Sequence, residues 1–357
     1  MSAHHPLSTS RRVRKASYRI GAQRDYSMRS RPLLSLVCGA ILAGMTCVGT
    51  PSRTLAQLAP PVATRFQEPQ QPIRVSVDLV NLFATVRDGK KRIVPDLEQV
   101  DFQVLEDGVE QKIANFSRET NLPITMGLLM DTSGSVQNLL AAEQEAASRF
   151  LQQVMRPSDL AMVISFDTDV DLLADFTADR GRLERAIERA RINAPQSTVS
   201  VQGPFPTVAR RSTAFYDAIY LACHEKLSRE AGRKSLVILT DAADYGSKMR
   251  LEEALETAQR TDTVIHILLV HDPRFGSDWG AARKFAEETG GRVIEVQNEK
   301  DLKKAFDQIS EELRTQYTLG YYSSNPARDG KFRKIKIELK KNGMKVLARK
   351  GYYAPRN

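Results

Sequence analysis

Five oxygen-bearing side chains, spread over three segments of the sequence, are of types that suit a metal ion. They are an Asp-x-Ser-x-Ser motif (Asp131, Ser133 and Ser135), Thr213 before a helical stretch, and Asp241 at the end of an apolar run. A hard divalent cation prefers oxygen ligands in a near-octahedral array and keeps part of its water. Three hydroxyls and two carboxylates supply such a set and leave a coordination position open.

The small number of acids in this set predicts what the site would do. A divalent cation held by two carboxylates keeps a net attraction for a further carboxylate from outside. The pattern therefore indicates ligand capture rather than a fully neutralised structural ion. The competing interpretation of Asp131, Ser133 and Ser135 is a cluster of helix N-cap residues, since Asp and Ser cap helices routinely.

The residues between these motifs predict the elements that position them. Near-continuous apolar runs are typical of strands buried on both faces of a sheet, and they cover residues 124–130, 160–166, 236–239 and 264–270. Helical patterns cover residues 136–155, 179–192, 214–230, 250–260, 278–289 and 299–314. This alternation predicts an α/β fold with a Rossmann-like, doubly wound, mainly parallel sheet, which binds ligands at the carboxyl ends of its strands.

The sequences on either side of this region alternate apolar and polar residues. Residues 73–118 and 315–357 contain Asp-Gly or Asn-Gly turns at 88–89, 107–108, 329–330 and 342–343, which predict short antiparallel strands. We expect three strands of the second segment to complete a β-sandwich-like module begun by the first. The α/β domain, residues 122–314, would then be inserted in a split antiparallel β-module.

The span of residues 123–313 resembles a von Willebrand factor type A (VWFA) domain, because the three motif pieces occur in the family's order and on the expected strand ends and loop. In that family these residues form a metal-ion-dependent adhesion site (MIDAS). The resemblance implies a bound Mg²⁺, in some members Mn²⁺. It would be held directly or through water by Asp131, Ser133, Ser135, Thr213 and Asp241. It also implies a protein partner whose acidic residue completes the metal shell.

Nearly the whole chain after its first 56 residues is also similar to the secreted VWFA-related proteins described in acidobacteria. Residues 289–291 read Thr-Gly-Gly before the last strand of the α/β region, and residues 316–322 read QYTLGYY. This second resemblance adds little about function. One residue departs from the wider family pattern: Ala242 stands where many members have Gly after the last metal-binding Asp.

Residues 1–56 have the layout of a secretory leader. A basic flank precedes the uncharged residues 33–49, and small residues follow at 54–56, which predicts a signal peptide cleaved near Ala56. The alternative is a membrane anchor, since this run is at the lower limit for a span, and membrane contact would then occur through the leader alone. A start at Met28 would give a more usual signal, and residues 57–72 are predicted to be a linker.

The formal net charge of +9 does not indicate a nucleic-acid-binding protein. Residues 1–32 hold eight Arg or Lys residues and one acid, so the chain after the leader is close to neutral and has no predicted basic face. Cys38 and Cys47 lie in the leader, which leaves Cys223 as a buried apolar residue and no internal disulfide. The histidines show no ligand spacing, and we expect His266 to be a core residue with satisfied hydrogen bonds.

These observations predict a secreted or envelope-associated protein-binding module, for adhesion or as a scaffold, that is not an enzyme. Asp167 and Asp169 offer carboxylates for catalysis, but the sequence has no Gly-rich phosphate loop, HExxH or GxSxG motif. The alternatives are a structural or assembly module of the cell envelope with a stabilising or vestigial metal site and, third, a metal-dependent hydrolase. The segment 193–212 would rim the site, where it either sets partner choice or is a tolerated insertion.

Overall fold

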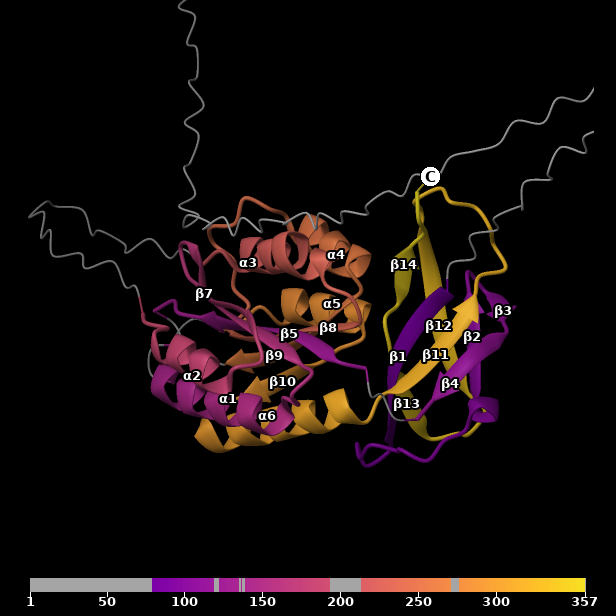
Figure 1. Ribbon diagram of the computed structural model, residues 1–357, viewed down its shortest axis with the longest axis horizontal. Coiled ribbons are helices and arrows are strands. Elements are labelled where there is room, and N and C mark those ends of the chain that lie inside the picture. The colour runs from indigo at the N-terminus through magenta and orange to yellow at the C-terminus, as the bar shows by residue number, and fades with distance from the viewer. Residues whose placement is uncertain are drawn as a thin grey trace, which may run out of the picture. The chain divides into compact units, whose positions relative to one another are not determined.

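The computed structural model describes residues 79–118, 122–134, 136, 139–192, 213–270 and 276–356. The leader, the linker, Ser135 and the segment 193–212 lie outside the described residues. The described elements form three sheets (Figure 1). One is mainly parallel and covered by helices, and the other two are antiparallel. The fold class predicted from the sequence is confirmed, whereas the boundaries assigned to the domains stay a prediction.

The central sheet has six strands in the order β10-β9-β8-β5-β6-β7. Five are parallel, and β7 pairs antiparallel with β6 at one edge. The apolar runs form these strands because both faces are covered, and every residue of β5 is buried. The strands are β5 (Ile124–Asp131), β6 (Leu160–Phe166), β7 (Val170–Thr177), β8 (Arg233–Thr240), β9 (Thr263–Val270) and β10 (Val293–Val296).

Helices cover both faces of this sheet (Figure 1). On one face, α1 (Leu140–Val154), α2 (Arg180–Glu188) and α6 (Glu299–Arg314) pack against apolar residues of β5 and β6. On the other face, α3 (Phe215–Leu221), α4 (Leu251–Arg260) and α5 (Trp279–Thr289) enclose a second core cluster. Side chains of Asp179, Asp278 and Asn298 cap α2, α5 and α6 by accepting backbone hydrogen bonds.

Three of the predicted helices differ from the observed ones by more than one residue. The helix expected over residues 179–192 ends at Glu188. The helix expected to begin at residue 136 begins at Leu140. The helix expected over residues 214–230 changes its hydrogen-bonding pattern twice: α3 continues as a π-helix (η2, Ala222–Lys226) and then as a 3₁₀ turn (η3, Leu227–Arg229). Cys223 lies in the π-helical part, is fully buried as predicted, and has its thiol pKa raised to about 12 by burial.

The antiparallel sheets have the orders β13-β1-β11-β4 and β14-β12-β2-β3 and share one apolar core. Both mix strands from before and after the α/β region: β1 pairs with β11 and β13, and β2 pairs with β12. A 3₁₀ turn, η1 (Gln99–Asp101), precedes β2. The strands are β1 (Leu79–Asp88), β2 (Phe102–Glu106), β3 (Val109–Gln111), β4 (Ile113–Ser117), β11 (Tyr317–Tyr322), β12 (Phe332–Leu339), β13 (Met344–Leu347) and β14 (Gly351–Tyr353).

The turn at Asp107-Gly108 between β2 and β3 has the conformation that its residues predict. Both residues have positive φ, 48° and 85°, as a two-residue type I′ hairpin requires. The second segment holds four strands rather than the three expected, because β14 has three residues and begins with Gly351, too little for an alternating pattern.

Charged contacts join these sheets to the α/β elements, and all the described residues belong to one compact unit. Arg87 of β1 binds Glu312 of α6, and Glu312 also lies 3.0 Å from Arg292.

The prediction that His266 is a core residue with satisfied hydrogen bonds was wrong in one respect. The side chain is buried, but neither ring nitrogen has a hydrogen-bond partner, and Glu312 Oε2 is 3.8 Å from Nδ1. Burial, with Arg292 and Arg87 nearby, lowers the pKa of His266 to about 3.

A buried ion pair lies in the core between the two antiparallel sheets. Arg333 Nη1 is 3.1 Å from Glu106 Oε1, and both side chains are almost fully buried. Glu106 also accepts hydrogen bonds from Tyr321 (2.7 Å), Ser323 (2.6 Å) and Tyr352 (3.1 Å). Burial alone would raise the pKa of Glu106, but these hydrogen bonds and that from Arg333 outweigh burial and lower it.

Replacement of Glu106 by Gln is expected to lower the free energy of unfolding by about 3 kcal/mol, because it leaves the Arg333 charge buried without its counterion. Urea unfolding followed by circular dichroism measures this change. Glu110→Gln, at an exposed position of β3, is the matched control and should leave the midpoint unchanged. Equal midpoints for the two variants would contradict a stabilising role for the pair.

Candidate metal centre

The first carboxylate of the predicted site is held rigidly at the end of β5. Asp131 is completely buried. Its Oδ1 accepts a hydrogen bond from Ser133 N (2.9 Å), and its Oδ2 accepts one from Thr240 Oγ1 (2.7 Å). Thr240 ends the neighbouring strand β8. The loop after β5 is therefore folded around this carboxylate, and Ser133 is brought beside it.

The second carboxylate follows β8 at the same edge of the sheet. Met130 pairs with Leu239 in the parallel register, so Asp131 and Asp241 leave adjacent strands at nearly the same level. Asp241 is 4% exposed, its Oδ1 accepts a hydrogen bond from Ala243 N (3.0 Å), and its carbonyl accepts one from Asp278 N (2.9 Å). The two acids interact electrostatically, since the charge of Asp241 raises the pKa of Asp131.

Thr213 reaches this edge on the loop before α3. It is 4% exposed, and its carbonyl accepts hydrogen bonds from the backbone of Tyr245 (3.1 Å) and Gly246 (3.2 Å), shortly after Asp241. On its other side, Ala214 N donates to the carbonyl of Asp167 at the end of β6 (2.6 Å). The structure thus gathers four of the five predicted residues at one edge, while Ser135 lies outside the described residues.

The electrostatics of this edge fit a bound cation. Burial, and after it the Asp241 charge, raises the pKa of Asp131 to about 7. Asp131 forms no ion pair with a Lys or Arg among the described residues, so its negative charge lacks a compensating side chain. Within the described part of the chain, no group of three or more His, Cys, Asp or Glu side chains is arranged to hold a metal. Besides the two carboxylates, the residues that the structure places at this edge include the hydroxyl-bearing Ser133 and Thr213, and hydroxyl oxygens are suitable ligands for a hard cation.

Three residues at this edge, Thr240, Tyr245 and Glu143, escaped the sequence analysis as site residues, and a fourth, Asp167, was considered there only as a catalytic carboxylate. Thr240 binds the Asp131 carboxylate, and Asp167 has one buried carboxyl oxygen without a hydrogen-bond partner. Tyr245 is 53% exposed beside the Thr213 loop, and Glu143 of α1 is completely buried. A signal existed for Glu143, because it shares the helical spacing of the apolar residues Ala147, Phe150 and Leu151. The other three occupy loops or strand ends without a periodic pattern.

Ala242, which departs from the resemblance described above, takes a backbone conformation that favours glycine. Its φ is +60°, its side chain is completely buried, and its N–H donates to Thr240 Oγ1 (2.9 Å). A left-handed conformation costs a non-glycine residue about 1–2 kcal/mol. The loop that carries Asp241 is therefore strained at the residue that follows it.

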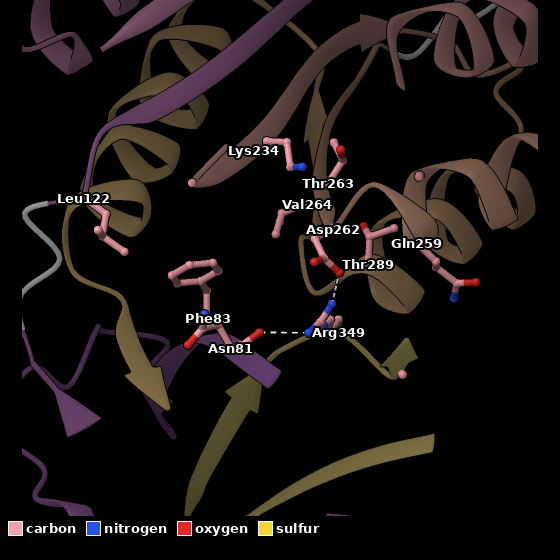
Figure 2. Close-up of a pocket in the computed structure, with 13 residues that line it drawn as sticks. Asn81, Phe83, Leu122, Lys234, Gln259, Asp262, Thr263, Val264, Thr289 and Arg349 are labelled. Atoms are coloured by element: carbon pink, nitrogen blue, oxygen red, sulfur yellow. Dashed lines mark hydrogen bonds and ion pairs between the residues drawn. The ribbon is translucent and has the colours of Figure 1, made fainter. Parts of the chain in front are cut away.

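A second hollow lies at the opposite, amino edge of the same sheet, between β1 and the starts of β8 and β9 (Figure 2). It has a volume of about 250 Å³. Arg349 crosses it, binding Asp262 and donating to the carbonyl of Asn81 (2.8 Å), and Lys234 donates to the carbonyl of Glu230 (3.1 Å). Because these charged groups already have partners within the chain, we interpret this hollow as part of the contact between sheets.

Comparison with known proteins supports the domain type. Residues 126–244 match the family model of the von Willebrand factor type A domain. No curated protein matches the sequence. A solved structure of the conserved hypothetical protein BatB from Bacteroides thetaiotaomicron is similar to this chain, with 18% identity, a TM-score of 0.41, and coverage of 53% of this chain and 97% of that one.

Two further solved structures show similarity at low identity. A von Willebrand factor type A protein from Catenulispora acidiphila has 12% identity and a TM-score of 0.46, over 80% of this chain and 75% of that one. Proximal thread matrix protein 1 from the mussel byssus, with a zinc-occupied MIDAS motif, has 15% identity and a TM-score of 0.45, over 58% of this chain. The chain spans about half, 49%, of that mussel protein. The similarity to acidobacterial proteins stays a prediction.

Without metal, the protein is expected to lose stability between pH 6.5 and 8. Burial, and then the charge of Asp131, raises the pKa of Glu143 to about 8, and that of Asp131 is raised to about 7. The folded chain therefore binds more protons than the unfolded chain in this range, so the free energy of unfolding falls as pH rises. His266 changes the free energy of unfolding in the opposite direction, because its lowered pKa means that the unfolded chain binds the additional proton. This contribution disappears above pH 6.5, the ordinary pKa of histidine.

Urea unfolding in EDTA at the two pH values measures this loss. Asp131→Asn should flatten the dependence, and millimolar Mg²⁺ should stabilise the wild-type protein more at the higher pH, where protons no longer compete for the carboxylates. The same slope in wild-type protein and Asp131→Asn would show that Asp131 is not the group responsible.

Ala242→Gly is expected to raise the free energy of unfolding by about 1 kcal/mol, because glycine adopts the left-handed conformation without the steric cost. The larger conformational entropy of glycine in the unfolded chain offsets part of this gain. Ala243→Gly is the control, since Ala243 is not among the described residues with positive φ, and it should destabilise. Thermal and urea unfolding compare the two. Destabilisation by both would contradict strain at Ala242.

Proposed function

We propose that this chain, whose residues 126–244 match the von Willebrand factor type A domain model, is a secreted or envelope-associated binding protein, for adhesion or as a scaffold. It captures a carboxylate of a protein partner at a MIDAS-type Mg²⁺ site. The observation that carries the proposal is the buried, electrostatically coupled pair Asp131 and Asp241 at the carboxyl edge of the parallel sheet.

The donor set supports Mg²⁺ at this edge. Asp131 and Asp241, with Ser133, Ser135 and Thr213, would hold the ion, and Mn²⁺ has similar ligand preferences. When bound, the ion supplies a coordination position that accepts an oxygen of the partner. The chain's own contribution is to keep these donors in place: Thr240 and Ser133 N fix the Asp131 carboxylate, and Ala243 N fixes that of Asp241.

The charge and the surface of this edge support a protein partner that presents an acidic residue. Two carboxylates balance the charge of a divalent cation but do not fill its coordination shell, so a position stays open for an oxygen of an incoming carboxylate. Tyr245, half exposed beside the Thr213 loop, offers an aromatic surface of the kind that protein interfaces use. A role in binding nucleic acid gains no support from the near-neutral chain after the leader.

Secretion rests on the predicted leader. Among the described residues, no helix is long and apolar enough to cross a membrane. We therefore propose that any membrane attachment occurs through the leader, if it is retained. A binding role, rather than an enzymatic one, is consistent with both acids of the site serving as metal ligands.

Calorimetric titration of Mg²⁺ into the purified chain tests the site. We expect saturable binding to the wild-type protein and an affinity reduced by about 100-fold or more in Asp241→Asn, because this change removes one of the two carboxylate charges of the site. Mn²⁺ should bind at the same site and show the same loss.

Asp262→Asn is the matched control, because it removes an acid at the opposite edge of the same sheet, where Asp262 binds Arg349. It should keep wild-type metal affinity. A second arm immobilises a peptide that carries a single Glu and its Gln counterpart, and the wild-type chain should bind the Glu peptide more strongly, in Mg²⁺ but not in EDTA. Absence of metal binding by the wild-type chain would refute carboxylate capture and favour a structural role.

A further inference from the structure

We propose that Glu143 is a third acidic residue of the metal centre, which acts on the bound cation from outside its direct ligands. This inference rests on the proposed function, because it concerns the same site. Glu143 is not part of the predicted metal-binding motif. It lies on α1, eight residues after the end of the Asp-x-Ser-x-Ser sequence.

The helix geometry places Glu143 over the metal edge. Glu143 begins a buried stripe on α1 that continues through Ala147, Phe150, Leu151 and Val154. These four pack in one cluster with residues of β5, so the stripe faces the sheet. Strands β5 and β6 are parallel, and α1 connects them, so α1 runs back from the carboxyl edge. The first turn of α1, with Glu143, therefore lies near the end of β5, where Asp131 is.

The surroundings of Glu143 lack the partner that a buried carboxyl group needs. Its side chain is 0% exposed, and neither carboxyl oxygen has a hydrogen-bond partner within the described residues. Burial of an unpartnered polar group costs free energy, and buried acids are normally paired or coordinate metals. The one charged neighbour that affects its pKa is Asp131, a further negative group.

The contrast with other buried acids of this chain shows how unusual this is. Glu106 is bound by Arg333 and three hydroxyl groups, and Glu312 lies against Arg87 and Arg292. The charged neighbour of Glu143 is another acid, Asp131, whereas Glu106 and Glu312 each have an arginine beside them. A divalent cation beside Asp131 would provide the missing compensation and would favour the ionised form of both acids.

An outer acid of this kind adds attraction for the cation without occupying a coordination position. It leaves the coordination position open for the partner's carboxylate, while its negative charge lowers the electrostatic attraction for that carboxylate. Residues that support metal ligands from outside typically change metal affinity by 10–100-fold when replaced. Glu143 would then set how tightly the site holds its ion, while Asp131 and Asp241 bind it.

The test is Mg²⁺ titration calorimetry on the full chain with Glu143→Gln, a nearly isosteric change that removes the charge. We expect the affinity to fall by about 10-fold or more. Glu145→Gln is the matched control: Glu145 lies two residues further along α1, is exposed and pairs with Arg149. It should bind Mg²⁺ like the wild-type chain. Urea midpoints in EDTA establish that both variants fold, and Glu143→Gln should be at least as stable as the wild-type chain at pH 8.

The outcomes separate this inference from the proposed function. Wild-type affinity in Glu143→Gln, with binding still lost in Asp241→Asn, would overturn the role of Glu143 and leave carboxylate capture standing. A loss of affinity equal in Glu143→Gln and Glu145→Gln would also overturn it, since a general effect of charge on α1 would then suffice. No saturable binding to the wild-type chain would overturn both.

Discussion

The parallel pairing of β5 with β8 is the constraint on which the candidate site depends. It brings two carboxylates, Asp131 and Asp241, to adjacent strand ends and removes both from water. Like charges repel strongly in such surroundings, so the edge is tolerable in two ways: by protonation of Asp131 or by binding of a cation. The proposed function uses the second, and the loops around the edge are consistent with it. Backbone N–H groups and the Thr240 hydroxyl fix the carboxylate oxygens, and the Thr213 loop is bonded to the segment that follows Asp241.

Elsewhere the chain compensates its buried charges internally. The sandwich core pairs Arg333 with Glu106, and α6 places Glu312 between Arg87 and Arg292. Asp159, after α1, accepts hydrogen bonds from Ile124 N and Arg156 N and binds Arg314. Asp131 and Glu143 have no cationic partner among the described residues, in contrast to these three acids. This contrast is the physical basis for the proposal that both acids belong to a single metal centre.

The sequence predicts the elements of this fold well where periodicity is strong. The apolar runs became β5, β6, β8 and β9, and the amphipathic pattern at 299–314 became α6 without a change of bounds. Short elements such as β14 have too few residues for a pattern, and the change from α- to π-helix at Ala222 depends on tertiary packing. At the site, residue type and motif order identify donors but not burial. The sequence therefore does not reveal that Ala242 is strained. The helical spacing of Glu143 indicates its burial, but not that its carboxyl group lacks a partner near Asp131.

The pairing of β4 with β11 has a mechanical consequence. Ser117, which precedes the α/β elements, pairs with Thr318, which follows them, so both connections leave the sandwich from neighbouring strands. A pull on a partner held at the metal edge would load these two strands together and in the same direction, so they would not slide past each other. If the chain is held on the N-terminal side of β1, the opposing force acts on β1, and the ladder between β11 and β1, from Ala84↔Tyr317 to Leu79↔Tyr322, resists the pull. Its hydrogen bonds are perpendicular to the strands, so tension along the strands shears them all at once rather than opening them one by one.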